Sequence, residues 1–253
     1  MMDLKTPEEI ATMLKGGKIL HEILLQLLSA AKAGETLERL DKLADKLILD
    51  SGGKPSFKMV KGYTWSICTC VNDIVVHGIP NDYILKDGDL LGIDCGIYLD
   101  GFHTDHAWTK IIGEGQNEDL SEKKKFLEVG KNALKNAMIQ VQPGNYIYDI
   151  SKAIQDTIEA GGYSVVRSLV GHGVGRSLHE APEVPGFVAG KRESYPKIIP
   201  GMVLAIEIIY NLGSPDIAYK EDDGWTISTK DGKISGLFEV TVGVSSHGGI
   251  VLT

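Results

Sequence analysis

Two apolar segments of the sequence follow the same pattern, and an acidic residue ends each of them. Residues 88–94 read G-D-L-L-G-I-D, and residues 201–207 read G-M-V-L-A-I-E. The two acids, Asp94 and Glu207, lie 113 positions apart in a chain of 253 residues. Chance similarity between two apolar strands does not explain why the glycine and the acid occupy the same positions in both segments. The pattern predicts an internal duplication that brings Asp94 and Glu207 to one site.

Helical patterns around these segments also keep the same order. Glycine pairs at 52–53 and 161–162 each end one of them. We therefore expect a single catalytic domain, residues 1–253, built from two halves at about 1–115 and about 120–253.

Periodicity and turn residues locate the other elements. Thr6-Pro7-Glu8-Glu9 is typical of a helix start, because threonine caps the helix, proline suits its first turn and Glu9 completes a capping box. Helices are expected from residue 7 to the break at 33–34 and over 37–48, 121–141 and 149–160. Strands are expected over 67–76, 90–98, 102–109, 165–170, 202–210 and 234–245, with connectors over 111–120 and 182–200 and a turn at 222–226.

Two acids lie within the hairpin that the Asp100-Gly101 turn predicts. Asp94 is part of the apolar first strand, and Asp105 is part of the second. An ionised carboxylate in an apolar strand is costly unless it is paired, and two on neighbouring strands repel each other. A divalent cation removes both problems. A buried ion pair, or exposure through a twisted strand, is the alternative reading of this hairpin.

The charge and cysteine content restrict the function classes. A net charge of −8 and a pI of about 5.4 argue against non-specific nucleic-acid binding. The N-terminal residues lack a signal-peptide pattern, and no apolar run is long enough for a membrane span. Three cysteines fit a reducing cytosol, and Cys68 and Cys70 read as small packing residues of a strand. We therefore expect a cytoplasmic protein.

A glycine-rich segment, residues 171–176, contains one histidine and precedes another. It is no dinucleotide-binding loop, because Pro182 and Pro185 follow too soon for a helix to begin there. His172 and His179 lie seven residues apart around these glycines. Their placement predicts metal ligands or acid–base groups.

Five polar residues therefore stand in apolar or glycine-rich surroundings. Four ionised carboxylates carry −4, which two divalent cations would balance, and a neutral imidazole adds a ligand without charge. Such a donor set suits Mn, Fe, Co or Zn, and a dinuclear site suggests hydrolysis of an amide or phosphoester. His77 and His179 remain as groups that exchange protons or stabilise an oxyanion. The five are Asp94, Asp105, His172, Glu207 and Glu239.

Nearly the whole chain resembles the bacterial type I methionine aminopeptidase family of pita-bread metallopeptidases. The resemblance rests on V-N-D-I-V-V-H-G-I-P, I-D-C-G-I-Y-L-D-G-F-H-T-D, G-H-G-V-G-R-S-L-H-E-A-P, A-I-E and the strand of Glu239. It implies an α+β pita-bread fold with a curved antiparallel sheet inside and helices outside. It also implies removal of the initiator methionine by attack of a metal-bridging water or hydroxide on the first peptide bond.

The resemblance also implies roles for individual residues. Asp94 would bind one metal, His172 and Glu207 the other, and Asp105 and Glu239 would bridge. Glu207 would also help to deprotonate the bridging water. His179 would stabilise the oxyanion, and His77 would contact the scissile amide nitrogen and act as an acid.

A narrow apolar pocket for methionine would be lined by Tyr63, Cys68 and Trp225, although packing explains each of them equally well when taken singly. A monovalent cation would bind near Asn72, Ile74 and Ser235, largely through backbone carbonyls. Three positions depart from the family pattern: Leu178 replaces phenylalanine, Ile208 proline and Val240 histidine. Leu178 would widen the pocket or loosen its hold on the methionine side chain.

The expected substrates are N-terminal Met peptides of nascent chains. We expect a monomer that associates transiently with the ribosome and binds neither a membrane nor a specific nucleic acid. Two alternatives share parts of this pattern: a proline-specific aminopeptidase or dipeptidase of the same fold, and a catalytically silent binding module.

Overall fold

The computed structural model describes residues 2–113, 119–220 and 223–253. Its helices in these ranges are α1 (Pro7–Ala30), α2 (Leu37–Asp50), α3 (Asp119–Ile139) and α4 (Ile147–Ala160). The predicted start of α1 is confirmed, because the Thr6 hydroxyl accepts the Glu9 N–H and the Glu9 carboxylate accepts the Thr6 N–H. None of the described helices combines the length and apolarity needed to cross a bilayer.

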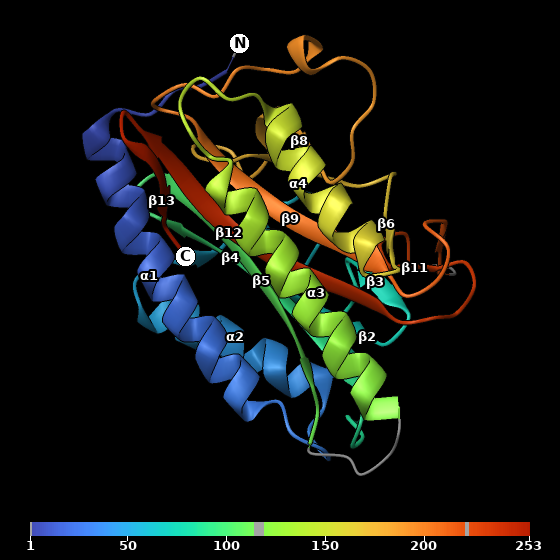
Figure 1. Cartoon of the computed structure of the whole chain (residues 1–253). Coiled ribbons are helices and arrows are strands. Elements are labelled where there is room, and N and C mark those ends of the chain that lie inside the picture. The colour runs from blue at the N-terminus through green and yellow to red at the C-terminus, as the bar shows by residue number, and fades with distance from the viewer. Residues whose placement is uncertain (1, 114–118, 221–222) are drawn as a thin grey trace.

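A large antiparallel sheet lies beneath the helices (Figure 1). Its strands run in the order β1-β4-β5-β12-β9-β7-β8, with β2 on β4, β6 on β9 and β13 on β12. A second sheet has the order β10-β11-β3. The strands are β1 (Lys54–Pro55), β2 (Ile67–Val71), β3 (Ile74–Val76), β4 (Leu90–Leu99), β5 (Phe102–Ile111), β6 (Ser164–Val165), β7 (Val170–Gly173), β8 (Glu180–Pro185), β9 (Val203–Asn211), β10 (Ile217–Tyr219), β11 (Ile227–Thr229), β12 (Ser235–Ser245) and β13 (Gly248–Val251). Two short 3-10 helices, η1 (Phe57–Met59) and η2 (Arg192–Ser194), lie in the connections.

The apolar faces of the helices bury one side of the sheet. Leu20 and Leu24 of α1 share a buried cluster with Ile93 and Cys95 of β4. A second cluster joins α3 and α4 to Ile206, Ile208, Phe238 and Val240 of β9 and β12. Because side chains alternate along a strand, the residues between these apolar ones face the other side of the sheet. Asp94, Glu207 and Glu239 are such residues.

The β4–β5 hairpin is the one that the sequence predicts. Asp100 and Gly101 at its tip both have positive φ, 50° and 93°. This is the conformation of a type I′ turn, whose twist matches that of the two strands.

Hydroxyl groups connect the two central strands, β5 and β12. Their paired backbone positions are Glu239 with Ala107 and Val240 with His106. On one side of these pairs, Thr109 Oγ1 donates to the Leu237 carbonyl at 2.7 Å and accepts the Leu237 N–H at 3.0 Å. On the other side, Thr241 Oγ1 donates to the Asp105 carbonyl at 2.8 Å and accepts the Asp105 N–H at 2.9 Å. Each threonine hydroxyl therefore bridges to the backbone of the opposite strand.

Three predicted elements are wrong in detail. The strand predicted over 67–76 is two strands, because Asn72 has a φ of 54° and its side chain bonds Asp89 and the Leu90 N–H, which turns the chain. The strand predicted over 165–170 is likewise divided, since β6 ends at Val165 and β7 begins at Val170. Only Val166 N–H still reaches the Ile209 carbonyl between them.

The predicted loop over 182–200 begins with a strand instead, because β8 extends to Pro185. β8 is an edge strand, where proline is tolerated, and its residue Val184 is fully buried. The predicted connector over 111–120 lies largely outside the described residues, as does Asp222 of the predicted turn.

Candidate metal centre and cavity

The acids selected from the sequence lie on four adjacent strands. Glu239 of β12 is the backbone partner of both Glu207 on β9 and Ala107 on β5. Ala107 in turn pairs with Asp94 of β4. Asp105 stands two residues from Ala107 and therefore on the same face of β5. The fold thus gathers acids from both halves of the chain on the sheet face opposite the helices.

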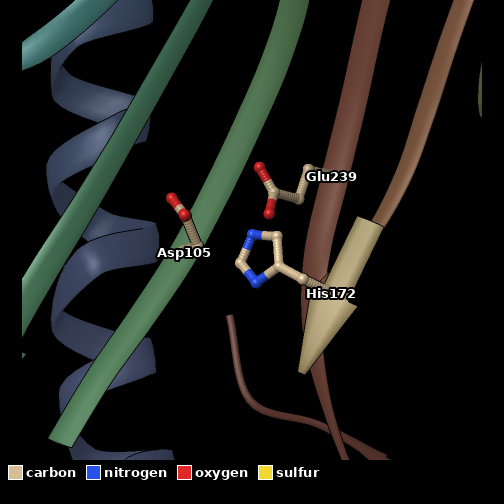
Figure 2. Close-up of side chains that lie close together, drawn as sticks. All are labelled: Asp105, His172 and Glu239. Carbon is tan, nitrogen blue, oxygen red and sulfur yellow. The ribbon is translucent and has the colours of Figure 1, made fainter. Parts of the chain in front are cut away.

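Asp105, His172 and Glu239 converge most closely (Figure 2). One ligand atom from each lies within 4.8 Å of the others, and all three side chains are buried. Glu207 adjoins this group, since its Oε1 is 3.6 Å from His172 Nε2. Figure 2 shows the three side chains directed into a shared space from β5, β7 and β12.

Burial raises the pKa values of all four acids. Burial, with repulsion from Asp105, raises the pKa of Glu207 to about 8. Burial raises the pKa of Asp105 to about 7. The pKa values of Asp94 and Glu239 also rise well above the ordinary range, because both are buried among the other acids. These four acids cannot all ionise at neutral pH unless positive charge lies among them.

The residues present fit divalent cations. Asp94 Oδ1 and Glu239 Oε1 are buried without a hydrogen-bond partner, which is costly for oxygens that nothing satisfies. His172 Nδ1 donates to the Gly173 carbonyl at 2.8 Å, which leaves the lone pair on Nε2 free for a ligand bond. Burial beside His179 lowers the pKa of His172 to about 4, so this ring is neutral at pH 7. Carboxylate oxygens with one imidazole nitrogen suit a divalent first-row metal.

A cavity of about 160 Å³ opens onto these acids. The ten residues that the sequence analysis assigned to catalysis, metal binding or the substrate all line it: Tyr63, Cys68, His77, Asp94, Asp105, His172, His179, Glu207, Trp225 and Glu239. Burial lowers the pKa of both His77 and His179, and both rings are therefore neutral at pH 7. His77 also holds a left-handed backbone, with a φ of 57°.

One end of the cavity is apolar. The Tyr63 ring packs edge-on against Trp225, with centroids 5.2 Å apart, and its hydroxyl donates to the Ile67 carbonyl. Phe57 and Val60 complete this wall, and the sequence analysis missed both. The short F-K-M-V run that contains them shows no periodicity, so only its nearness to Tyr63 could have indicated them.

The three departures from the family pattern fall on different sides of the sheet. Leu178 lines the cavity. Ile208 and Val240 belong instead to the core beneath α3 and α4. Of the three, only Leu178 can contact a bound ligand directly.

The residues expected near a monovalent cation lie apart from the acids. Ser235 N–H donates to the Asn72 carbonyl at 2.8 Å, which joins the start of β12 to the turn before β3. Asn72 and Ile74 line a second cavity.

A sequence model of the metallopeptidase family M24 matches residues 11–248. The chain therefore belongs to this family. It is 43% identical to a methionine aminopeptidase of Clostridium perfringens over 100% of this chain and 99% of that protein. The crystal structure of methionine aminopeptidase from Rickettsia prowazekii has a TM-score of 0.94 and 33% identity, with 100% of both chains covered. The predicted pita-bread fold is thereby confirmed.

A prolidase from Pyrococcus furiosus is more distant. Its TM-score is 0.76 at 21% identity, and the match covers 99% of this chain and 65% of that one. This likeness shows the shared fold alone.

Proposed function

We propose that this chain is a metal-dependent aminopeptidase that removes the N-terminal methionine from nascent proteins. The observation that carries the proposal is a row of buried acids, two of them with unsatisfied oxygens, at the floor of a cavity with an apolar wall. Full-length relatives named methionine aminopeptidase support it.

Two divalent ions of Co, Mn, Fe or Zn, which metal analysis of the purified protein would identify, would be held by five side chains. Asp94 would bind one ion, His172 and Glu207 the other, and Asp105 and Glu239 both. Bound there, the ions would neutralise the acids, activate water and polarise the scissile carbonyl.

The remaining polar groups would handle protons and the substrate. Glu207, ionised once the metal ions are bound, would accept the proton of the attacking water. His179, whose neutral ring lines the cavity, would donate a hydrogen bond to the developing oxyanion. His77 would contact the amide nitrogen that leaves. Tyr63, Cys68 and Trp225 would enclose the methionine side chain.

Substrate profiling tests this function. The metal-loaded protein should cleave a Met-Ala peptide much faster than an Ala-Pro peptide. Preference for Ala-Pro would instead favour a proline-specific enzyme of the same fold. Turnover of neither peptide by protein with bound metal would favour a silent binding module.

We also propose the finer properties that the resemblance implies. The protein would act in the cytoplasm as a monomer that associates transiently with the ribosome. Carbonyls of Asn72, Ile74 and Ser235 would hold a monovalent cation. The chain would be a single catalytic domain, residues 1–253, that arose by internal duplication.

A further inference from the structure

A buried lysine ahead of α1 contacts the loop that carries His179. This loop, residues 174–179, joins β7 to β8. The Lys5 backbone N–H donates to the Gly201 carbonyl at 2.7 Å, and 1% of the Lys5 side chain is exposed. A Cβ on Gly175 would lie 2.2 Å from Lys5 Cε. The glycine therefore leaves the space through which the lysine stem passes.

A buried ammonium group requires an anion, and Glu180 supplies it. Lys5 Nζ pairs with Glu180 Oε2 and also donates to the Asp3 carbonyl. The other carboxylate oxygen, Glu180 Oε1, accepts the Ser177 N–H at 2.9 Å. Glu180 directly follows His179, so the bond between Ser177 and Glu180 closes a turn around this histidine.

The solvent side of the loop is held by the same N-terminal segment. Arg176 donates to Asp3 at 2.7 Å and pairs with Glu9 at the start of α1. The rings of His179 and His172 lie edge to face, with centroids 4.5 Å apart. A displacement of the loop would therefore move His179 relative to the acids.

We propose that Lys5 is a positioning residue, which fixes Glu180 and through it the direction of the His179 ring. This inference rests on the proposed function, in which His179 touches the substrate. Lys5 itself lines no part of the cavity and supplies no proton to the reaction.

Lys5→Met tests the proposal, because methionine keeps an apolar stem and removes the charge. With metal bound and Met-Ala peptide as substrate, kcat should fall on the order of 10- to 100-fold. KM and metal content should stay unchanged. The Ser177 amide should exchange hydrogen faster, since its acceptor is released. Lys15→Met is the matched control, because Lys15 of α1 makes an exposed pair with Asp100 at the tip of the β4–β5 hairpin.

A second variant separates charge pairing from packing. Lys5→Met/Glu180→Gln carries no unpaired buried charge, and glutamine retains an oxygen for the Ser177 N–H. It should recover most of the lost kcat, and it should fold even if Lys5→Met does not. In that case the positioning role predicts near-normal kcat for the double variant and reduced kcat for Glu180→Ala.

Three results would overturn the proposal: a normal kcat in Lys5→Met despite faster Ser177 exchange, parallel loss of kcat and metal, or no recovery in the folded double variant. A wild-type protein inactive on Met-Ala would refute the proposed function instead. Ser177 exchange would then still report whether Lys5 holds the loop.

Discussion

The N-terminal and C-terminal halves of this chain share features of their backbone but differ in chemistry. Each has a long helix followed by a helix of 14 residues, α2 in one half and α4 in the other. Thr109 of β5 and Thr241 of β12 make the same pair of hydrogen bonds to the opposite strand. The acidic residues of these two strands do not follow the same symmetry. Glu239 lies opposite Ala107, and Asp105 lies opposite Thr241.

This comparison shows where the chemistry of the site is free to vary. Thr109 and Thr241 are constrained, because each must bond the backbone of the opposite strand. Side chains on the cavity face can differ between the halves, provided that their charge and length suit a bound ligand. The N-terminal half supplies two aspartates, and the C-terminal half supplies two glutamates and a histidine. Substitutions at the unmatched positions should therefore have larger effects on activity than on the fold.

The largest effect is expected from Asp105→Asn, which removes one of the two acids that have no acidic counterpart in the other half. Asparagine has the same shape but no charge, so turnover should fall by more than roughly 100-fold while the circular dichroism spectrum stays native. Asp94→Asn, at the matched position of the N-terminal half, should also reduce turnover by orders of magnitude. Near-normal activity in either variant would refute the ligand assignment.

His179→Ala should have the next largest effect. Loss of an oxyanion donor lowers kcat on the order of 10² to 10³-fold, with little change in metal content. The measurement is steady-state kinetics together with metal analysis of the same sample. Parallel loss of metal and kcat would make His179 a ligand.

The metal-free protein should lose stability as the pH rises from about 6.5 to about 8. An acid whose pKa is higher in the folded than in the unfolded chain retains its proton in the folded state, so the free energy of unfolding falls with increasing pH. The raised pKa values of Asp105, about 7, and Glu207, about 8, extend this loss through neutrality and end it near pH 8. His172, with a pKa lowered to about 4 from 6.5, acts in the opposite direction only at lower pH.

Thermal melts after chelation would measure this dependence. Added Mn²⁺ or Co²⁺ should reverse the slope, because the metal binds the ionised acids. A chelated protein with flat or rising stability over the same range would contradict the charge argument.

The smallest effect is expected at Leu178, which lines the cavity. Leu178→Phe should change the ratio of kcat/KM between Met and norleucine peptides by only a few-fold, since two side chains of nearly equal size differ in an apolar pocket by less than the roughly 1–3 kcal/mol that a whole methylene is worth. Ile208→Val is the control on the opposite face. It should lower the free energy of unfolding by about 1 kcal/mol and leave that ratio unchanged.

The sequence predicted the helices, the central hairpin and the neighbourhood of the acids, because each depends on local signals. Apolar periodicity located α1 to α4, and Asp100-Gly101 located the turn. The division at Asn72 and the strand β8 escaped prediction, because they depend on a side chain bonding distant backbone and on an available sheet edge. Phe57 and Lys5 were missed for a similar reason. Their environments are assembled by segments far away in the sequence.

The two threonine hydroxyls between β5 and β12 also set a spacing. Where the peptide groups of adjacent strands hydrogen-bond directly to each other, the geometry of those bonds sets the distance between the strands. Here an oxygen atom on each side stands between the strands, and Asp105 and Glu239 are mounted on these same two strands. The hydroxyl groups of Thr109 and Thr241 therefore determine how far apart Asp105 and Glu239 lie. They thereby determine the distance that an ion between these two acids would have to bridge.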